Sequence, residues 1–474
     1  MVLPDPDTCY RALQGRDSRF DGWFFIAVRT TRIYCRPSCP AITPLRQNVT
    51  FHPSAAAAQR AGYRACKRCR PDASPGSPDW DIRGDLAGRA LRLIRDGIID
   101  REGVPGLAGR LGYSERQIHR SLVAEVGASP LALARAQRAQ TARILLETTD
   151  LAAADVAFAA GFASVRQFNE TVQDVFATTP TGLRLARGER SPSVAGVLDL
   201  RFPFRAPMDL GATLDFLGTR AIPGVESYDG TTFTRTLGLP GGPALAELSD
   251  GGGYVRCQLR LTDQRDLIAA VARLRRLLDL DADPVAVDNL FDADPQLSLL
   301  VRKRAGLRSP GAVGGFEMAM RAVVGQQISV RGARTILGRI AADLGTVAFE
   351  GEPWLLFPSA ADFAASDPAT LPMPQARAAT LHRIAAEMAG GDLALDPGAD
   401  RGATRAALLA LPGIGTWTAD YLIMRAVGDP DVLLASDLGV RKAAESLDID
   451  LAGKARDWAP WCSYATHHLW ATLH

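Results

Sequence analysis

Residues 35–39 read CRPSC and residues 66–69 read CKRC, which places four of the seven cysteines of this 474-residue chain in two close pairs. The first pair has the spacing C-x3-C, the second has C-x2-C, and 26 residues separate them. Two such pairs, brought together by a folded spacer, supply four soft thiolates at the tetrahedral geometry of a closed zinc site. Four ordinary buried thiols or two disulfides are the alternatives, but the regular spacing favours Zn2+. The predicted ligands are Cys35, Cys39, Cys66 and Cys69.

Length and composition indicate an ordinary globular protein of several domains. A chain of 474 residues should form roughly three or four domains. Hydrophobic residues make up 47% and charged residues 22%, which excludes a disordered or membrane-spanning chain. We find no stretch of 18 apolar residues and no signal peptide at the N-terminus, so we expect a cytoplasmic protein without a membrane partner.

The charge is distributed unevenly along the chain. Residues 1–190 contain 27 Lys and Arg against 19 Asp and Glu, a net charge of +8, whereas the remainder carries 27 against 33, a net of −6. A basic front part is typical of DNA binding. Nearly all of its basic residues are Arg, which suits bidentate contacts to phosphates and base edges.

Two stretches rich in Pro, Gly and Ser, at residues 71–79 and 191–196, divide the chain. We therefore expect one domain at 1–75 and a second at 80–190. A third part begins at 197.

The middle part predicts two copies of a helix-turn-helix, at residues 104–126 and 151–176. Each copy has a glycine followed by an aromatic residue at its turn, and a serine that can cap the second helix. The glycines and serines are Gly112, Ser114, Gly161 and Ser164. Two generic helical hairpins are the alternative, but the duplication favours DNA reading. The candidate DNA-reading side chains are Arg116, His119 and Arg120 in the first copy and Arg166, Gln167 and Asn169 in the second.

The cysteine pairs and the paired helix-turn-helix, over residues 20–187, together resemble the Ada-type methyl phosphotriester repair module fused to an AraC-type DNA-binding domain. The resemblance implies that Cys35 is a nucleophile as well as a zinc ligand, and that it accepts a methyl group from an alkylated backbone phosphate. Zinc would hold its sulfur as a thiolate at neutral pH without a general base. Methylation would also make the centre less negative, and so raise its affinity for DNA. A closed structural zinc knuckle without transfer is the alternative.

A second motif, LPGIGTWTA at residues 411–419, carries a separate chemistry. Its two glycines, Gly413 and Gly415, form a tight turn that opens a helix, where backbone N–H groups can approach a DNA phosphate. Asp437 follows 22 residues after Gly415 in an apolar setting, which favours a carboxylate held close to a substrate pocket.

With residues 316–329 and 458–470, this motif makes residues 199–474 resemble the helix-hairpin-helix DNA glycosylases, most closely the 3-methyladenine DNA glycosylase II (AlkA) type. The resemblance implies a mixed α/β subdomain, which we place at 197–285, and a helical glycosylase domain at 286–474. The damaged base would be flipped into a cleft between helical subdomains.

The resemblance assigns roles to individual residues of this part. Asp437 matches the family's essential aspartate, and the aromatic residues Trp417, Tyr421 and Trp470 match positions that line the base pocket. Aromatic faces attract electron-poor alkylated purines, and a carboxylate can stabilise oxocarbenium character at the sugar or orient water. Gln327 stands where the family has a leucine wedge that fills the gap left by the flipped base.

Several positions depart from the patterns of related proteins. Leu438 replaces an aromatic residue after Asp437, so pocket selectivity should differ. Trp417 stands where backbone-cutting relatives have a Schiff-base Lys, which predicts a monofunctional glycosylase. Cys462 stands alone, so no iron-sulfur cluster is expected. The sequence also lacks a Pro-Cys-His-Arg methyltransferase motif, so we do not expect removal of O6-methylguanine.

The sequence therefore predicts a multidomain α+β protein: a small four-cysteine zinc domain, an all-α paired helix-turn-helix, a mixed α/β subdomain and a helical helix-hairpin-helix glycosylase domain. We expect it to repair and sense DNA alkylation, with methyl transfer to Cys35, transcription regulation, and hydrolytic release of 3-methyladenine-type bases. Its expected partners are double-stranded DNA with alkylated bases and methyl phosphotriesters, and RNA polymerase. A regulator whose glycosylase domain only binds DNA, or a glycosylase with an inert zinc knuckle, are the alternatives.

Overall fold

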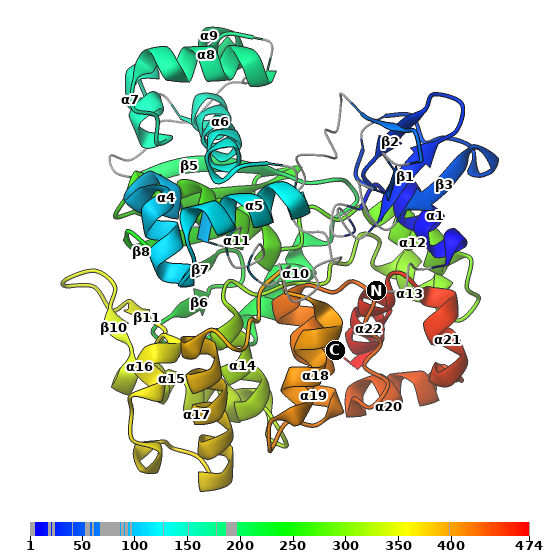
Figure 1. Ribbon diagram of the computed structural model, residues 1–474. Coiled ribbons are helices and arrows are strands. Elements are labelled where there is room, and N and C mark those ends of the chain that lie inside the picture. The colour runs from blue at the N-terminus through cyan, green and yellow to red at the C-terminus, as the bar shows by residue number, and fades with distance from the viewer. Residues whose placement is uncertain are drawn as a thin grey trace.

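The computed structural model shows a small sheet, a first group of helices, a larger sheet and a second group of helices in chain order (Figure 1). This multidomain α+β architecture confirms the predicted fold class. The described residues are 5–17, 20, 24–39, 41–52, 57–58, 61–66, 86, 90, 93–94, 97–126, 128–149, 151–176, 178–185, 197–397 and 399–473.

The N-terminal part is a helix packed on a four-stranded sheet of order β3-β1-β2-β4. Its helix α1 (Pro6–Gln14) starts where the Asp5 side chain accepts hydrogen bonds from two backbone amides, and Pro6 suits the first turn. Cys9 and Leu13 of α1 are buried against this sheet. The strands are β1 (Phe25–Val28), β2 (Ile33–Cys35), β3 (Val49–His52) and β4 (Arg64–Ala65).

The first group of helices contains the two predicted helix-turn-helix units. Both turn glycines have left-handed backbones, with φ of 72° at Gly112 and 86° at Gly161. Ser114 and Ser164 each accept a hydrogen bond from the backbone amide three residues on, which confirms both predicted caps. The first unit starts where predicted: the backbone of Gly103 is not helical, with a φ of 68° and a ψ of −172°, and it separates the helix that follows it from the helical residues before it. The helices are α4 (Ile98–Leu111), α5 (Glu115–Val126), α6 (Pro130–Thr148), α7 (Ala153–Ala159), α8 (Val165–Phe176) and α9 (Pro180–Leu185).

The larger sheet is antiparallel, with strand order β5-β9-β8-β7-β6. Alternate residues of β8 and β9 are buried, because one face of the sheet packs on α10 (Leu210–Gly218) and α11 (Leu267–Leu277). Helix α6 lies against β5 and α11, so one continuous core joins this sheet to the helix-turn-helix part (Figure 1). The strands are β5 (Val197–Pro203), β6 (Glu226–Tyr228), β7 (Phe233–Leu239), β8 (Gly242–Asp250) and β9 (Tyr254–Leu261).

The second group of helices encloses two further cores. One core surrounds α14, α17 and α19, and the other surrounds α12, α20 and α22. Tyr421 packs against both cores, which places it at their junction. A short hairpin of β10 (Thr346–Val347) and β11 (Leu355–Leu356) interrupts the helices. The helices are α12 (Pro284–Asp292), α13 (Ser298–Lys303), α14 (Gly315–Val324), α15 (Val330–Leu344), α16 (Ala360–Ala364), α17 (Gln375–Gly390), α18 (Arg401–Ala410), α19 (Thr416–Leu422), α20 (Leu438–Ser446), α21 (Leu451–Trp458) and α22 (Cys462–Trp470).

Short helical turns complete the described chain. They are the 3-10 turns Arg46–Asn48, Gln264–Asp266, Pro368–Thr370 and Ala471–Leu473, and the π-helical turn Ile423–Val427. None of the helices in the described ranges combines the length and the hydropathy that crossing a membrane requires.

Candidate active site and zinc centre

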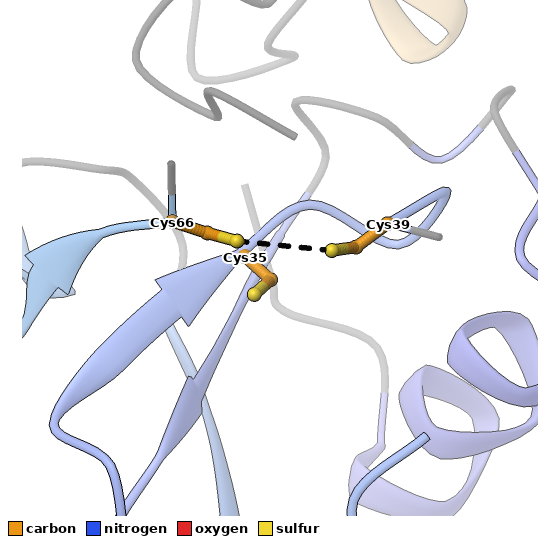
Figure 2. A group of neighbouring side chains, drawn as sticks. All are labelled: Cys35, Cys39 and Cys66. Carbon is orange, nitrogen blue, oxygen red and sulfur yellow. Dashed lines mark hydrogen bonds between the residues drawn. The ribbon is translucent and has the colours of Figure 1, made fainter. Parts of the chain in front are cut away.

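Three cysteines meet at one end of the small sheet (Figure 2). Cys35 ends β2, Cys39 lies in the turn that follows, and Cys66 lies directly after β4. Because β2 and β4 pair in parallel, the ends of both strands lie side by side, and the Cys66 amide donates to the Tyr34 carbonyl at 2.9 Å. The strand pairing therefore brings together thiols that are far apart in the sequence.

The geometry of this cluster fits Zn2+. All three Sγ atoms lie within 4.8 Å of one another, and those of Cys39 and Cys66 are 4.0 Å apart. A Zn–S bond of about 2.3 Å places the sulfur atoms of a tetrahedral site about 3.8 Å apart. Cys35 is 9% exposed, against 4% for Cys39 and 6% for Cys66. Cys69, the fourth predicted ligand, lies outside the described residues.

The glycine turn joins α18 to α19, as predicted. Gly413 has a φ of 91°, and a Cβ there would collide with the side chain of Thr380, so this position requires glycine. Gly415 precedes the first turn of α19, and a Cβ there would meet none of the described atoms within 4 Å. Gln326 ties the turn to the end of α14 by donating to Thr418 Oγ1 at 2.8 Å. The turn is thus closely packed at Gly413 and open at Gly415.

Asp437 accepts three hydrogen bonds. The indole Nε1 of Trp417 donates to its Oδ2 at 2.8 Å, and that of Trp470 donates to its Oδ1 at 2.9 Å. The amide of Val440 donates to Oδ1 at 3.0 Å, so the carboxylate also caps α20. Two residues predicted to be pocket walls therefore hold the carboxylate as hydrogen-bond donors. These hydrogen bonds were not predicted from the sequence.

A cavity of about 550 Å3 opens beside Asp437. Trp417, Tyr421 and Trp470 line it together with the carboxylate. The rings of Trp417 and Tyr421 are stacked, with centroids 5.2 Å apart and planes 11° apart, and the Tyr421 and Trp470 centroids are 6.4 Å apart. The four predicted residues are therefore brought together from α19, α22 and the start of α20.

Arg425 forms another wall of this cavity, and it is not among the residues predicted from the sequence. The π-helical turn carries its side chain inward, where Nη1 donates to Tyr421 Oη at 2.9 Å and the guanidinium lies 5.0 Å from the Phe216 centroid. Its Nε has no hydrogen-bond partner among the described residues. Arg220 lies 3.8 Å from the same Phe216 centroid. An arginine inside the apolar run 422–427 was the signal available in the sequence.

Burial shifts the pKa values of the ionisable groups in and beside this wall. Burial lowers the pKa of Arg220 to about 10 and lowers that of Arg425. Burial, together with the charges of these two arginines, lowers the pKa of His467 well below its usual value, so this histidine is neutral. The cavity consequently has an anionic side at Asp437 and a cationic side at Arg425 and Arg220.

A buried ionic network supports the cavity from the side of the larger sheet. Arg235 donates to Glu226 at 2.8 Å and to Glu317 at 2.9 Å, and Arg321 donates to the same two carboxylates at 2.6 and 2.8 Å. Although burial opposes ionisation, the two guanidinium groups lower the pKa of Glu317 to about 2. The network fixes α14 to β6 and β7.

The remaining predicted DNA-contacting residues lie on the surface. Gln327 is exposed in a left-handed backbone conformation with a φ of 60°, next to Ile328, which lines the cavity. Arg166 pairs with Glu170 at 2.9 Å, and Gln167 accepts a hydrogen bond from the amide of residue 163. All six DNA-reading candidates, Arg116, His119, Arg120, Arg166, Gln167 and Asn169, are exposed on α5 and α8.

Three family models match this chain in order. They are the metal binding domain of Ada at residues 8–72, a helix-turn-helix domain at residues 107–186 and the AlkA N-terminal domain at residues 199–314. Together with the cysteine cluster, they define a multidomain DNA-binding protein that carries a Zn2+ site and an AlkA-type part.

Similarity to a known relative over nearly the whole chain identifies one family within this class of DNA-binding proteins. The chain is 51% identical over 479 residues to a Mycobacterium tuberculosis protein named probable bifunctional transcriptional activator/DNA repair enzyme AlkA, covering 99% of this chain and 97% of the relative. It belongs to this family of fused Ada- and AlkA-type proteins.

Other similarities cover a smaller share of the chain. DNA-3-methyladenine glycosylase 2 of Escherichia coli is 30% identical over 275 residues, covering 57% of this chain and 95% of that protein. A solved 3-methyladenine DNA glycosylase from Archaeoglobus fulgidus covers 57% of this chain and 97% of its own, with 22% identity and a TM-score of 0.51. This last likeness shows a shared fold.

Proposed function

We propose that this chain repairs DNA alkylation and regulates the response to it, with base excision at Asp437 and methyl transfer to Cys35. The observation that carries base excision is the carboxylate of Asp437, held by two indole N–H groups at the wall of a 550 Å3 cavity. A cavity of this size accommodates a single flipped base. The named activities of the relatives support this assignment.

In base excision, the chain's own residues bind the base and stabilise the sugar. The bond between C1′ and the base nitrogen breaks, and the base leaves with the electron pair. Positive charge then develops on the sugar, where the fixed carboxylate of Asp437 stabilises it. Water adds to C1′ and loses a proton. Because three hydrogen bonds occupy most of the roughly four lone-pair sites of the carboxylate, an electrostatic role suits Asp437 better than proton abstraction.

The reaction stops at base release. Trp417 occupies the position at which a Schiff-base Lys would stand, and its Nε1 is engaged with Asp437. This supports a monofunctional glycosylase. Gly413 and Gly415 would bind a DNA phosphate at the turn before α19, and Gln327, with the neighbouring apolar Ile328, would enter the gap left by the base.

In methyl transfer, the Cys35 sulfur forms a bond to the methyl carbon, and the carbon–oxygen bond of the phosphotriester breaks. The phosphate diester leaves with the electron pair. Zinc supplies ionised thiolates at neutral pH. Cys35 is the most exposed residue of the three described cysteines, which supports it as the nucleophile. Cys39, Cys66 and Cys69 would hold the metal with it.

Transcription regulation belongs to the helix-turn-helix part, which we place at residues 80–190. The methyl-acceptor domain precedes it at 1–75, and the two glycosylase parts follow at 197–285 and 286–474. The exposed residues of α5 and α8 would read a DNA sequence, with RNA polymerase as a partner. Arg116, His119 and Arg120 are the better placed set, because Arg166 and Gln167 on α8 already make local hydrogen bonds.

Base release from methylated duplex DNA tests the central claim. We expect Asp437→Asn to abolish release while it retains DNA binding, because asparagine still accepts hydrogen bonds but carries no charge. Asp420→Asn is the control, since Asp420 lies on α19 but pairs with Arg405 and is absent from the cavity wall. Equal release by Asp437→Asn and the unmodified protein would remove Asp437 from the mechanism.

A further inference from the structure

The turn that follows α1 is docked on the C-terminal helices (Figure 1). Trp461 Nε1 donates to Asp17 Oδ2 at 3.1 Å, across 444 residues of sequence. Asp17 is 1% exposed and Trp461 is 2% exposed. Because a buried carboxylate is stable only when hydrogen-bonded, this contact is an integral part of the packing and not a loose surface contact.

The packing around Gly15 is equally close. A Cβ at this position would lie 2.9 Å from Ala286 Cβ and 2.9 Å from the Trp461 ring. The φ of Gly15 is −72°, so the backbone accepts any residue, and glycine is needed only for space. Arg205 Nη1 also donates to the Gly15 carbonyl at 3.2 Å and to Asp283 at 3.1 Å. The zinc-binding part and the glycosylase part are thus fitted to each other.

Trp461 is the residue that precedes α22, and α22 holds the segment that leads to Asp437. Ser463 Oγ donates to the carbonyl at position 429 at 2.7 Å and accepts from the amide at 432 at 3.0 Å. Thr466 Oγ1 accepts from the amide at 434 at 3.3 Å. At the end of the same helix, Trp470 donates to Asp437. A chain of contacts therefore connects Asp17 to the carboxylate in the cavity.

We propose that the zinc-binding part is a positioning partner for base excision, because its turn at residues 15–17 fixes Trp461, α22 and the segment that carries Asp437. This inference rests on the proposed role of Asp437. Asp17 and Gly15 are positioning residues, since both lie outside the cavity. Base release consequently depends on docking of the N-terminal part, whereas methyl transfer at Cys35 does not.

The test is single-turnover base release by the full-length, zinc-loaded protein. Gly15→Ala adds one methyl group at the interface, and we expect it to slow release by roughly tenfold or more at unchanged DNA affinity, because small misplacements of catalytic groups have large effects on rate. The backbone amides at 432 and 434 should also exchange hydrogen faster. Gly453→Ala on α21 is the matched control, since its Cβ would meet none of the described atoms within 4 Å.

A second pair of variants approaches the interface from the other side. Trp461→Phe removes the donor to Asp17 and should slow release, and adding Asp17→Asn should restore part of the rate, because it removes the buried charge. A purely structural role would lower thermal stability without slowing release by the folded protein. If Gly15→Ala fails to bind zinc, these two variants still test whether docking of the N-terminal part controls base release.

The outcomes separate this proposal from the one on which it rests. Unchanged release rates and unchanged amide exchange in Gly15→Ala and Trp461→Phe would overturn the docking proposal, while an inactive Asp437→Asn would leave the proposed function standing. Release by Asp437→Asn at the normal rate would instead remove the proposed function. Methyl transfer to Cys35 should be the same in Gly15→Ala and Gly453→Ala, which shows that the zinc-binding part is folded.

Discussion

The zinc centre and the cavity at Asp437 differ in how many parts of the fold their function requires. At the zinc centre, three thiols within 4.8 Å of one another can hold Zn2+, and in the proposed methyl transfer the metal would supply the reactivity, so few neighbours are needed. At the cavity, the carboxylate of Asp437 depends on donors from α19, α20 and α22. Substitutions at the zinc centre should therefore act in an all-or-none way, whereas substitutions of the residues that surround Asp437 should have graded effects.

The largest expected effect is at Cys35. Cys35→Ser should abolish methyl transfer, because a hydroxyl is a much weaker nucleophile than a zinc-bound thiolate. Base release should be unaffected, since the docking contact uses residues 15–17. Mass mapping after incubation with methylated DNA measures the first result, and an added methyl group on another cysteine of the Cys35→Ser protein would contradict the assignment.

The next effect concerns the indole donors. Trp417→Phe keeps an aromatic face but replaces the indole by a smaller ring without an N–H donor to Asp437. It should slow base release by about 10- to 100-fold, since hydrogen bonds to charged groups contribute roughly 1.5–3 kcal/mol. Trp458→Phe is the control, because Trp458 donates in the same way to Asp294, away from the cavity. If both variants released base at the same rate, the cavity would not depend on its donors, and the comparison with the zinc centre would fail.

Arg425 should influence which base is released. Arg425→Met removes a cation from the cavity wall, so release of a cationic 3-methylated adenine should rise relative to release of a neutral base by about tenfold. The ratio of the two rates is measured on one protein preparation, so loss of folded protein cancels. Arg405→Met, outside the cavity, should leave the ratio unchanged. The same ratio in both variants would show that Arg425 is only structural.

The smallest effect is on stability against acid. Burial lowers the pKa of His468 to about 4, so between about pH 6.5 and pH 4 the unfolded chain binds a proton that the folded chain does not. Stability should fall as the pH falls through this range, by about 2 kcal/mol at pH 5 from this residue. In His468→Phe, the drop in unfolding temperature between pH 6.5 and pH 4 should be smaller by a few degrees. If the unfolding temperature of His468→Phe depended on pH as strongly as that of the unmodified protein, residues other than His468 would cause the sensitivity to acid.

The sequence predicted features that depend on local spacing. The cysteine pairs, the left-handed glycines Gly112 and Gly161 and the serine caps of α5 and α8 all follow from residues near one another in the chain. Family resemblance, confirmed by the relatives, added the AlkA-type part. The start of the first helix-turn-helix at residue 104 was predicted, whereas the short helical segment from Ile98 to the kink at Gly103 was not.

Long-range polar contacts could not be predicted in the same way. Nothing near Arg425 indicates that the π-helical turn directs it against Phe216, more than 200 residues away. The network of Glu226, Arg235, Glu317 and Arg321 likewise joins a sheet and a helix whose packing decides which charges meet. Such contacts depend on the packing of whole elements.

By itself, the sequence determined the thiols that can bind zinc, the glycines that a tight turn requires and the carboxylate at Asp437, because these are properties of residue type and spacing. Only the tertiary structure decided that two indoles hold Asp437, that Arg425 lines the cavity, and that Asp17 is buried against Trp461. The physical reason is that a buried polar group must find its partner wherever packing brings one, at any distance along the chain.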